Sequence, residues 1–128
     1  MCMAVYLATT VPVPDADRAP LAVEPAAEET APRLRRHLSL PHLYHVASHE
    51  GCGCGFVLDH GEGTDEDCSE RQASALALRE LAAEAARRGG AELLVCTGGQ
   101  EDAPPRSTRT FDPENFEVHL GDHVLYKL

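Results

Sequence analysis

The sequence predicts an α+β fold in which one long helix packs on a mixed, four- to five-stranded sheet, in two layers. Residues 65–88 are rich in Ala, Leu, Glu and Arg, which favour helix. Short apolar runs of strand length lie before and after that segment. One long helix against several strands favours a two-layer arrangement.

The expected strands follow from the apolar runs. Residues 3–9 form a continuous apolar run typical of a buried strand, and residues 42–48 and 92–96 are the second and third core strands. If these two are neighbours joined by the helix, they run parallel through a right-handed crossover. Residues 107–111 are a further candidate strand.

The C-terminal residues predict a hairpin. Phe116, Val118 and Leu120 alternate with polar residues, as in a half-buried strand. Gly121-Asp122 then provides a two-residue turn with glycine first, which is typical of a type II′ hairpin.

The long helix has start and stop signals of its own. Thr64 with Asp67 resembles a capping box, and Gly89-Gly90 is a C-terminal stop. A stripe of small and apolar residues predicts the face that packs on the sheet. Its members are Cys68, Ala75, Leu78, Ala82 and Ala85.

Composition indicates a single acidic domain over residues 1–128. Its apolar fraction is 43% and its net charge is −10. This charge argues against nucleic acid and anionic membranes as partners, because both attract Lys and Arg. Five of the nine prolines lie between residues 11 and 32, so we expect an irregular Pro-rich segment at 11–33.

The N-terminal residues predict a cytoplasmic protein. They lack the basic region of a secretion signal, and no apolar run reaches eighteen residues. The five cysteines are therefore expected to be reduced, and they are candidates for metal binding or redox chemistry before structural disulfides.

The segment SHEGCGCG, residues 48–55, is the candidate site. It contains His49, Cys52 and Cys54 and follows the second core strand, while Cys96 ends the third. If the first strand runs antiparallel to both, Cys2 reaches the same sheet edge. Thiolates with an imidazole are typical ligands of zinc and other thiophilic ions, so these five residues are the candidate metal ligands.

Two other interpretations compete with the metal site. A thiol redox protein would use Cys52 and Cys54, with His49 tuning the thiolate, although no basic residue is near in sequence and Glu50 opposes thiolate formation. Alternatively, the glycines shape a turn, the cysteines are small buried hydrophobes, and the protein is an interaction domain, such as a homodimer formed through an edge strand.

Motifs of known chemistry are absent from the sequence. There is no P-loop and no dinucleotide fingerprint, so no nucleotide cofactor is expected. There is also no G-x-S-x-G or H-E-x-x-H motif, and the acidic stretch 59–70 does not fit an EF-hand. The sequence thus indicates neither a substrate nor a reaction.

Overall fold

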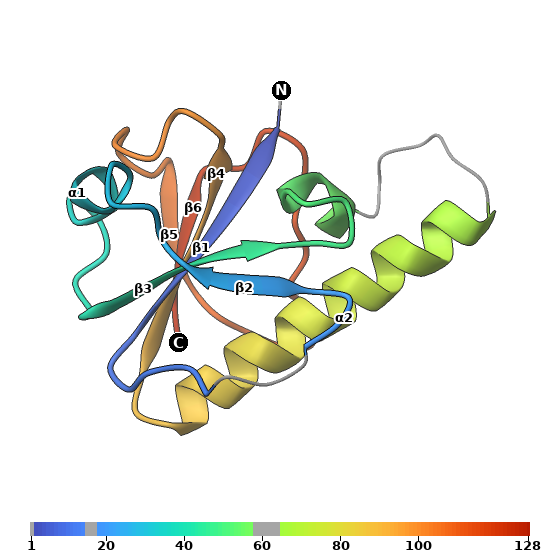
Figure 1. The fold of residues 1–128 in the computed structure, drawn as a ribbon, viewed down its shortest axis with the longest axis horizontal. Helices are drawn as coiled ribbons and strands as arrows, with labels where there is room; N and C mark the ends of the chain where they lie inside the picture. The colour runs from blue at the N-terminus through green and yellow to red at the C-terminus, as the bar shows by residue number, and fades with distance from the viewer. Residues whose placement is uncertain (1, 15–17, 58–64) are drawn as a thin grey trace.

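The computed structural model describes residues 2–14, 18–57 and 65–128 (Figure 1). Within them, six strands form one mixed sheet in the order β2-β3-β1-β4-β6-β5. The strands are β1 (Met3–Thr9), β2 (Ala22–Pro25), β3 (His42–Ala47), β4 (Ala91–Thr97), β5 (Ser107–Thr110) and β6 (Val124–Lys127). The helices are α1 (Ala31–Leu34), the 3₁₀ helix η1 (Gly53–Phe56) and α2 (Asp65–Arg87).

The α+β class with one long helix and a mixed sheet is confirmed, whereas the expected number of strands is wrong. The sheet has six strands because a four-residue strand occupies each edge: β5 falls within the candidate strand at 107–111, and β2 lies in the Pro-rich segment that was expected to be irregular. Both edge strands are largely exposed, so neither contains the apolar run that identifies a core strand.

Strand β1 lies between β3 and β4 and runs antiparallel to both. Tyr6, for example, is opposite His45 on one side and Leu94 on the other. The expectation that the second and third core strands are neighbours is therefore wrong. Their C-terminal ends nevertheless lie at the same sheet edge, because both are antiparallel to β1, and β1 begins at that edge.

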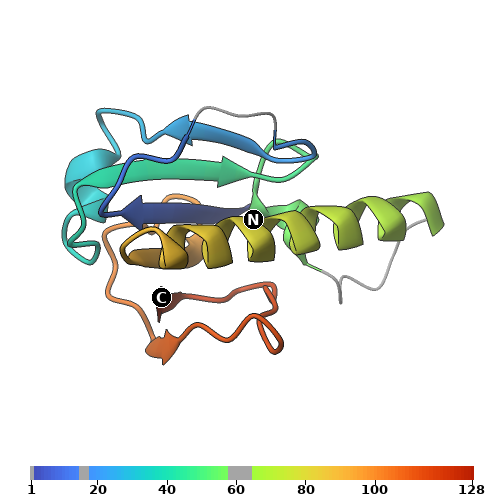
Figure 2. The same cartoon turned by 90° about the horizontal axis from the view of Figure 1, so that it is seen from below.

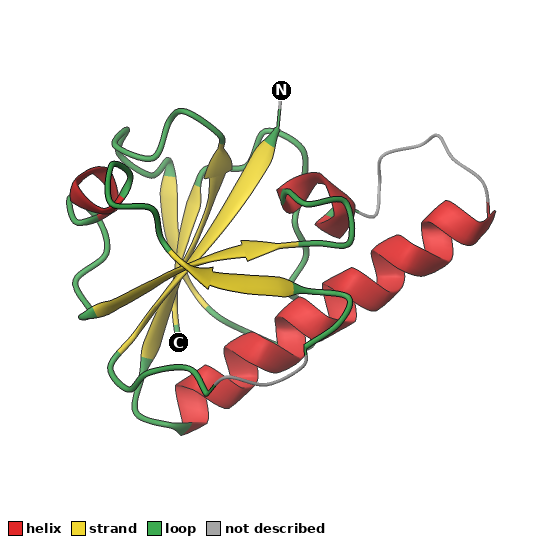
Figure 3. Cartoon of the chain, in the orientation of Figure 1, coloured by secondary structure: helices red, strands yellow, loops and turns green. Residues whose placement is uncertain are grey.

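The two faces of the sheet pack in separate apolar clusters. Leu78 and Leu81 of α2 contact the face that contains Met3, Val5 and Leu7. The opposite face, with Tyr6, Leu94 and Cys96, is covered by Leu34 and Leu38, from α1 and the turn after it. Figure 3 shows α1 and α2 far apart on different sides of the strands. A simple two-layer description therefore omits the cover that α1 provides.

The expected C-terminal hairpin is wrong. Strand β6 pairs with β4 and β5, and Val118 forms only an isolated bridge with Val57. The Asp122 N–H donates to the His119 carbonyl at 3.1 Å, so Gly121, with φ of +85°, is the third residue of the turn. Burial of Phe116 and Val118 draws this segment into the core cluster under α2 rather than into a strand beside β6.

Helix α2 ends at Arg87, close to the expected residue, and Gly89 and Gly90 follow with positive φ. The capping box at Thr64 and Asp67 lies outside the residues whose side chains the structure describes. No helix in the described ranges is both long and apolar enough to cross a membrane.

The stripe predicted for α2 is correct only in its C-terminal half. Leu78, Ala82 and Ala85 are buried, but Cys68 is exposed. Figure 2 shows why, since the N-terminal half of α2 extends beyond the end of the sheet. The prediction that Cys68 is a core residue is therefore wrong.

We expect Leu78→Ala to lower the free energy of unfolding by about 2–5 kcal/mol, because Leu78 is 1% exposed and its truncation leaves a cavity under the sheet. The matched control is Leu76→Ala on the same helix, where the side chain is 53% exposed and the expected change is within about 0.5 kcal/mol. Urea denaturation of both variants measures the difference. Equal losses would contradict the observed orientation of α2.

Candidate functional site

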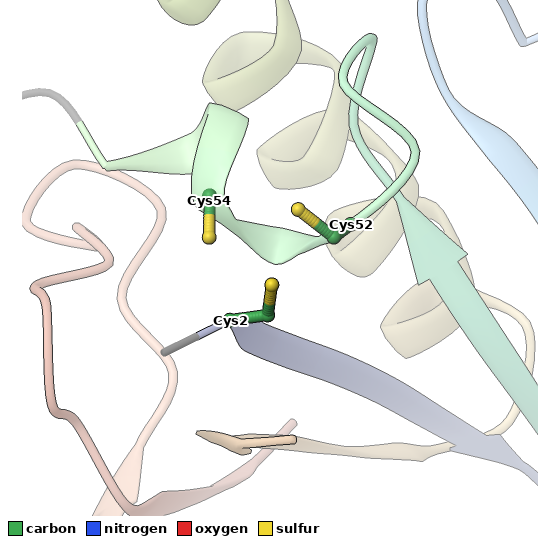
Figure 4. A group of neighbouring side chains, drawn as sticks. All are labelled: Cys2, Cys52 and Cys54. Atoms are coloured by element: carbon green, nitrogen blue, oxygen red, sulfur yellow. The ribbon is translucent and has the colours of Figure 1, made fainter.

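Three cysteine side chains meet at the sheet edge where β1 begins (Figure 4). The sulfur atoms of Cys2, Cys52 and Cys54 lie within 4.8 Å of one another. Cys2 is exposed, and the other two are partly buried. Among the described residues they form the one group of three or more Cys, His, Asp or Glu side chains close enough to share a metal ion. We call this group the cysteine cluster.

Cys2 reaches the cysteine cluster because it directly precedes β1. Its carbonyl accepts a hydrogen bond of 2.7 Å from the Gly98 N–H, in the segment after β4. The next N–H along the chain, that of Met3, donates to the sulfur of Cys54 at 3.4 Å. The start of β1 is thus bonded on one side to the segment after β4 and on the other to the loop after β3.

The loop after β3 begins with a tight turn organised by Ser48. The Ser48 N–H and hydroxyl both donate to the Cys52 carbonyl, at 2.9 and 2.6 Å. The Gly51 N–H donates back to the Ser48 carbonyl at 2.9 Å. Gly51 has φ of +83°, which a residue with a side chain rarely adopts. This turn presents Cys52 at the sheet edge.

A change of backbone conformation allows a C-x-C spacing to bring its two sulfurs together. Cys52 is extended, with φ of −146° and ψ of −175°, and η1 starts at the following residue. In a continuous strand, Cys52 and Cys54 would lie on the same face but about 6.6 Å apart along the chain, which is two residue rises. The 3₁₀ turn has a shorter rise per residue, so it brings Cys54 closer to Cys52 and Cys2.

The other two glycines of the loop are required by close packing. A Cβ on Gly53 would lie 2.8 Å from the Met3 carbonyl oxygen, and one on Gly55 would lie 2.7 Å from Ser48 Cβ. Both distances are shorter than real Cβ contacts. The alternating glycines therefore let the loop lie directly against β1 and against its own first turn.

Arg71 of α2 holds the loop from the other side. Its Nη1 donates to the carbonyls of Cys54 and Val57 at 3.2 and 3.1 Å, and its Nη2 lies 3.4 Å from Glu50 Oε1. The Arg71 side chain is only 12% exposed. One guanidinium thus joins both ends of the loop to the helix.

His49 is directed away from the cysteine cluster. Its backbone N–H donates to Ser74 Oγ at 3.3 Å, and its ring Nδ1 lies 2.8 Å from the same oxygen. Its Nε2 is 3.4 Å from Glu70 Oε2 and 3.9 Å from Glu50 Oε1. The group of side chains that could share an ion does not include His49.

The backbone of Cys96 lies close to the start of β1, but its side chain is not part of the cysteine cluster. Cys96 pairs with Ala4 in the sheet, close to the start of β1, as its strand position predicts. However, its side chain is 0% exposed and belongs to the apolar cluster on the face covered by α1. Burial, and then the Glu101 carboxylate, raise the pKa of Cys96 to about 12. Cys96 is thus a buried thiol outside the cysteine cluster.

Within the cysteine cluster, Cys52 has a perturbed thiol. Burial raises the pKa of Cys52 most, and the neighbouring thiols of Cys54 and Cys2 raise it further. A backbone hydrogen bond at Cys54 lowers this pKa but does not offset the rise. A thiol with a raised pKa carries little thiolate near neutral pH, so it is a weak nucleophile unless a cation replaces its proton.

Sequence reasoning missed the two residues of α2 that hold the loop. Ser74 follows Arg71 by three positions and precedes the buried Leu78 by four, so the three share one helical face. Extending the apolar stripe backward from Leu78 at this spacing would have found them. Neither residue is apolar, and a search for apolar periodicity therefore passes over both.

We expect Gly53→Ala to destabilise the protein by about 1–3 kcal/mol, because the added methyl group overlaps the Met3 backbone, which cannot rotate away. The control is Gly98→Ala, whose Cβ would meet the Cys2 carbonyl at an ordinary 3.4 Å. Thermal unfolding of both variants tests this. A neutral Gly53→Ala would mean that the loop does not lie against β1.

We expect Arg71→Gln to lower the free energy of unfolding by about 1–3 kcal/mol, because the Val57 carbonyl loses its side-chain donor. It should also speed hydrogen exchange of the amides in residues 50–57. Arg87→Gln, at the exposed end of the same helix, is the control. Unchanged exchange in Arg71→Gln would show that the guanidinium does not hold the loop.

Comparisons with known proteins identify no relative. The chain matches no protein-family model, no curated protein and no solved structure. The function must therefore be argued from the geometry and chemistry of the site.

Proposed function

We propose that the protein binds a single thiophilic metal ion, such as zinc, through the thiolates of Cys2, Cys52 and Cys54. The observation that carries this proposal is the mutual approach of the three sulfurs to within 4.8 Å. Zinc–sulfur bonds of about 2.3 Å set the sulfurs about 3.8 Å apart around a tetrahedral ion. Small side-chain rotations would therefore bring all three onto one ion.

The chemistry of the donors supports the same proposal. Thiolates are soft ligands that select zinc and Cu(I) over magnesium or calcium, which prefer oxygen. The net charge of −10 attracts cations to the surface of the protein. In addition, the Ser48 turn and Arg71 hold the loop by hydrogen bonds. The loop is therefore already ordered, and metal binding loses little conformational entropy.

The number of ligands favours an exchangeable ion over an enclosed one. Structural zinc sites are closed by four protein ligands, whereas three leave one position open to an external ligand. With His49 and Cys96 engaged elsewhere, the cysteine cluster supplies three. Cys2, which is exposed, borders the solvent-facing side.

The redox interpretation has less support. A redox cysteine needs a lowered pKa, and the pKa of Cys52 is raised, chiefly by burial. Arg71, the cation that sequence reasoning lacked, donates to backbone carbonyls, and the ion pair it makes is with Glu50. Metal binding is favoured over thiol exchange because the ion itself displaces the proton.

We expect protein purified under reducing conditions and loaded with zinc to retain about one ion per chain. Cys52→Ser and Cys54→Ser should each lower the zinc content sharply, because each removes a ligand. Cys68→Ser, an exposed cysteine outside the cysteine cluster, should leave it unchanged. Elemental analysis after exhaustive dialysis measures the content, which should fall as the pH is lowered because protons compete for the thiolates.

Two results would contradict the proposed metal centre. Zinc content that is insensitive to replacement of Cys2, Cys52 and Cys54 would refute the metal centre. A metal-free protein in which oxidation joins Cys52 to Cys54 and reductant separates them would favour the redox interpretation instead. Circular dichroism of each variant establishes that the fold is retained before either result is interpreted.

A further inference from the structure

We infer that the ion held by the cysteine cluster is Cu(I), bound in a plane by three thiolates with no fourth ligand from the described residues; this rests on the proposed metal centre and specifies its ion. The inference comes from the coordination number that the described residues can supply. Zinc in structural sites is almost always four-coordinate, whereas Cu(I) is a soft, monovalent, closed-shell ion that three thiolates satisfy.

Among the residues that the structure describes, the neighbouring His, Glu and Cys side chains that could add a fourth ligand are each engaged elsewhere. The His49 ring is fixed between Ser74 and Glu70, at 2.8 and 3.4 Å. Glu50 is paired with Arg71 at 3.4 Å. Cys96 is fully buried on the opposite face of the sheet. Recruiting any of them would break an existing hydrogen bond, an ion pair or the core packing.

The spacing of the sulfurs also fits a planar three-coordinate ion. Three bonds of about 2.3 Å in a plane separate the sulfurs by about 4.0 Å, slightly more than the tetrahedral separation. All three sulfur pairs here are within 4.8 Å, which leaves a small contraction on binding. An iron–sulfur cluster, by contrast, is normally held by four cysteines.

The burial of the three sulfurs indicates how such an ion could enter and leave. Cys52 and Cys54 are partly buried, whereas Cys2 is exposed just before the start of β1. A thiolate from a donor molecule can therefore approach the ion from the side of Cys2. Exchange of one thiolate for another conserves the oxidation state of Cu(I) and requires no reductant.

The test is an anaerobic titration of reduced, zinc-loaded protein with Cu(I), buffered by a Cu(I) chelator. One equivalent of Cu(I) should displace the zinc, and X-ray absorption should then show three sulfur neighbours and no nitrogen or oxygen neighbour. Cys2→Ser should weaken Cu(I) binding by more than about 100-fold. Loss of an outer-shell partner already weakens metal binding by up to about 100-fold, and Cys2 is a direct ligand in this inference. Cys68→Ser should bind Cu(I) like the unaltered protein.

Different results would overturn the Cu(I) assignment and the metal centre itself. Zinc that withstands excess Cu(I), or a nitrogen or oxygen ligand on the bound Cu(I), would overturn the Cu(I) assignment and leave the metal centre intact. Binding of several Cu(I) ions per chain would overturn it as well. Failure of the unaltered protein to bind either metal would remove the metal centre itself. The absorption spectrum uses unaltered protein, so the test does not depend on a variant that folds.

Discussion

The antiparallel pairing of β1 with both β3 and β4 is the constraint on which the site depends. It brings the beginning of β1 to the same sheet edge as the ends of two strands that are distant in sequence. Cys2 then lies beside the loop that follows β3, and the Met3 N–H reaches the sulfur of Cys54 at 3.4 Å. With a parallel β1, Cys2 would lie at the other end of the sheet.

Helix α2 has two distinct roles along its length. Its C-terminal half packs Leu78, Leu81 and Ala85 on the sheet and so contributes to the core. Its N-terminal half extends beyond the strands (Figure 2). There, Arg71 and Ser74 hold the loop after β3, which contains Cys52 and Cys54, by hydrogen bonds. One rigid element therefore connects the stability of the sheet to the position of the cysteine cluster.

Sequence reasoning was accurate where the determining forces are local. Helical propensity and the glycine stop predicted a helix over residues 65–88, and the structure has Asp65–Arg87. It was inaccurate where distant segments compete for the same partner. The expected hairpin at Gly121-Asp122 is absent because β6 pairs with β4 and β5, and no local signal ranks those pairings against a hairpin.

The sequence by itself determined the class of fold, the long helix and the alternation of glycine with Cys52 and Cys54. Those glycines permit a positive φ at Gly51 and close packing at Gly53, but only the tertiary structure decided that Met3 is what Gly53 packs against. The tertiary structure also decided which thiols meet. Side-chain direction depends on strand pairing and on the contacts of α2, and these forces turned His49 toward Ser74 and buried Cys96 on the opposite face.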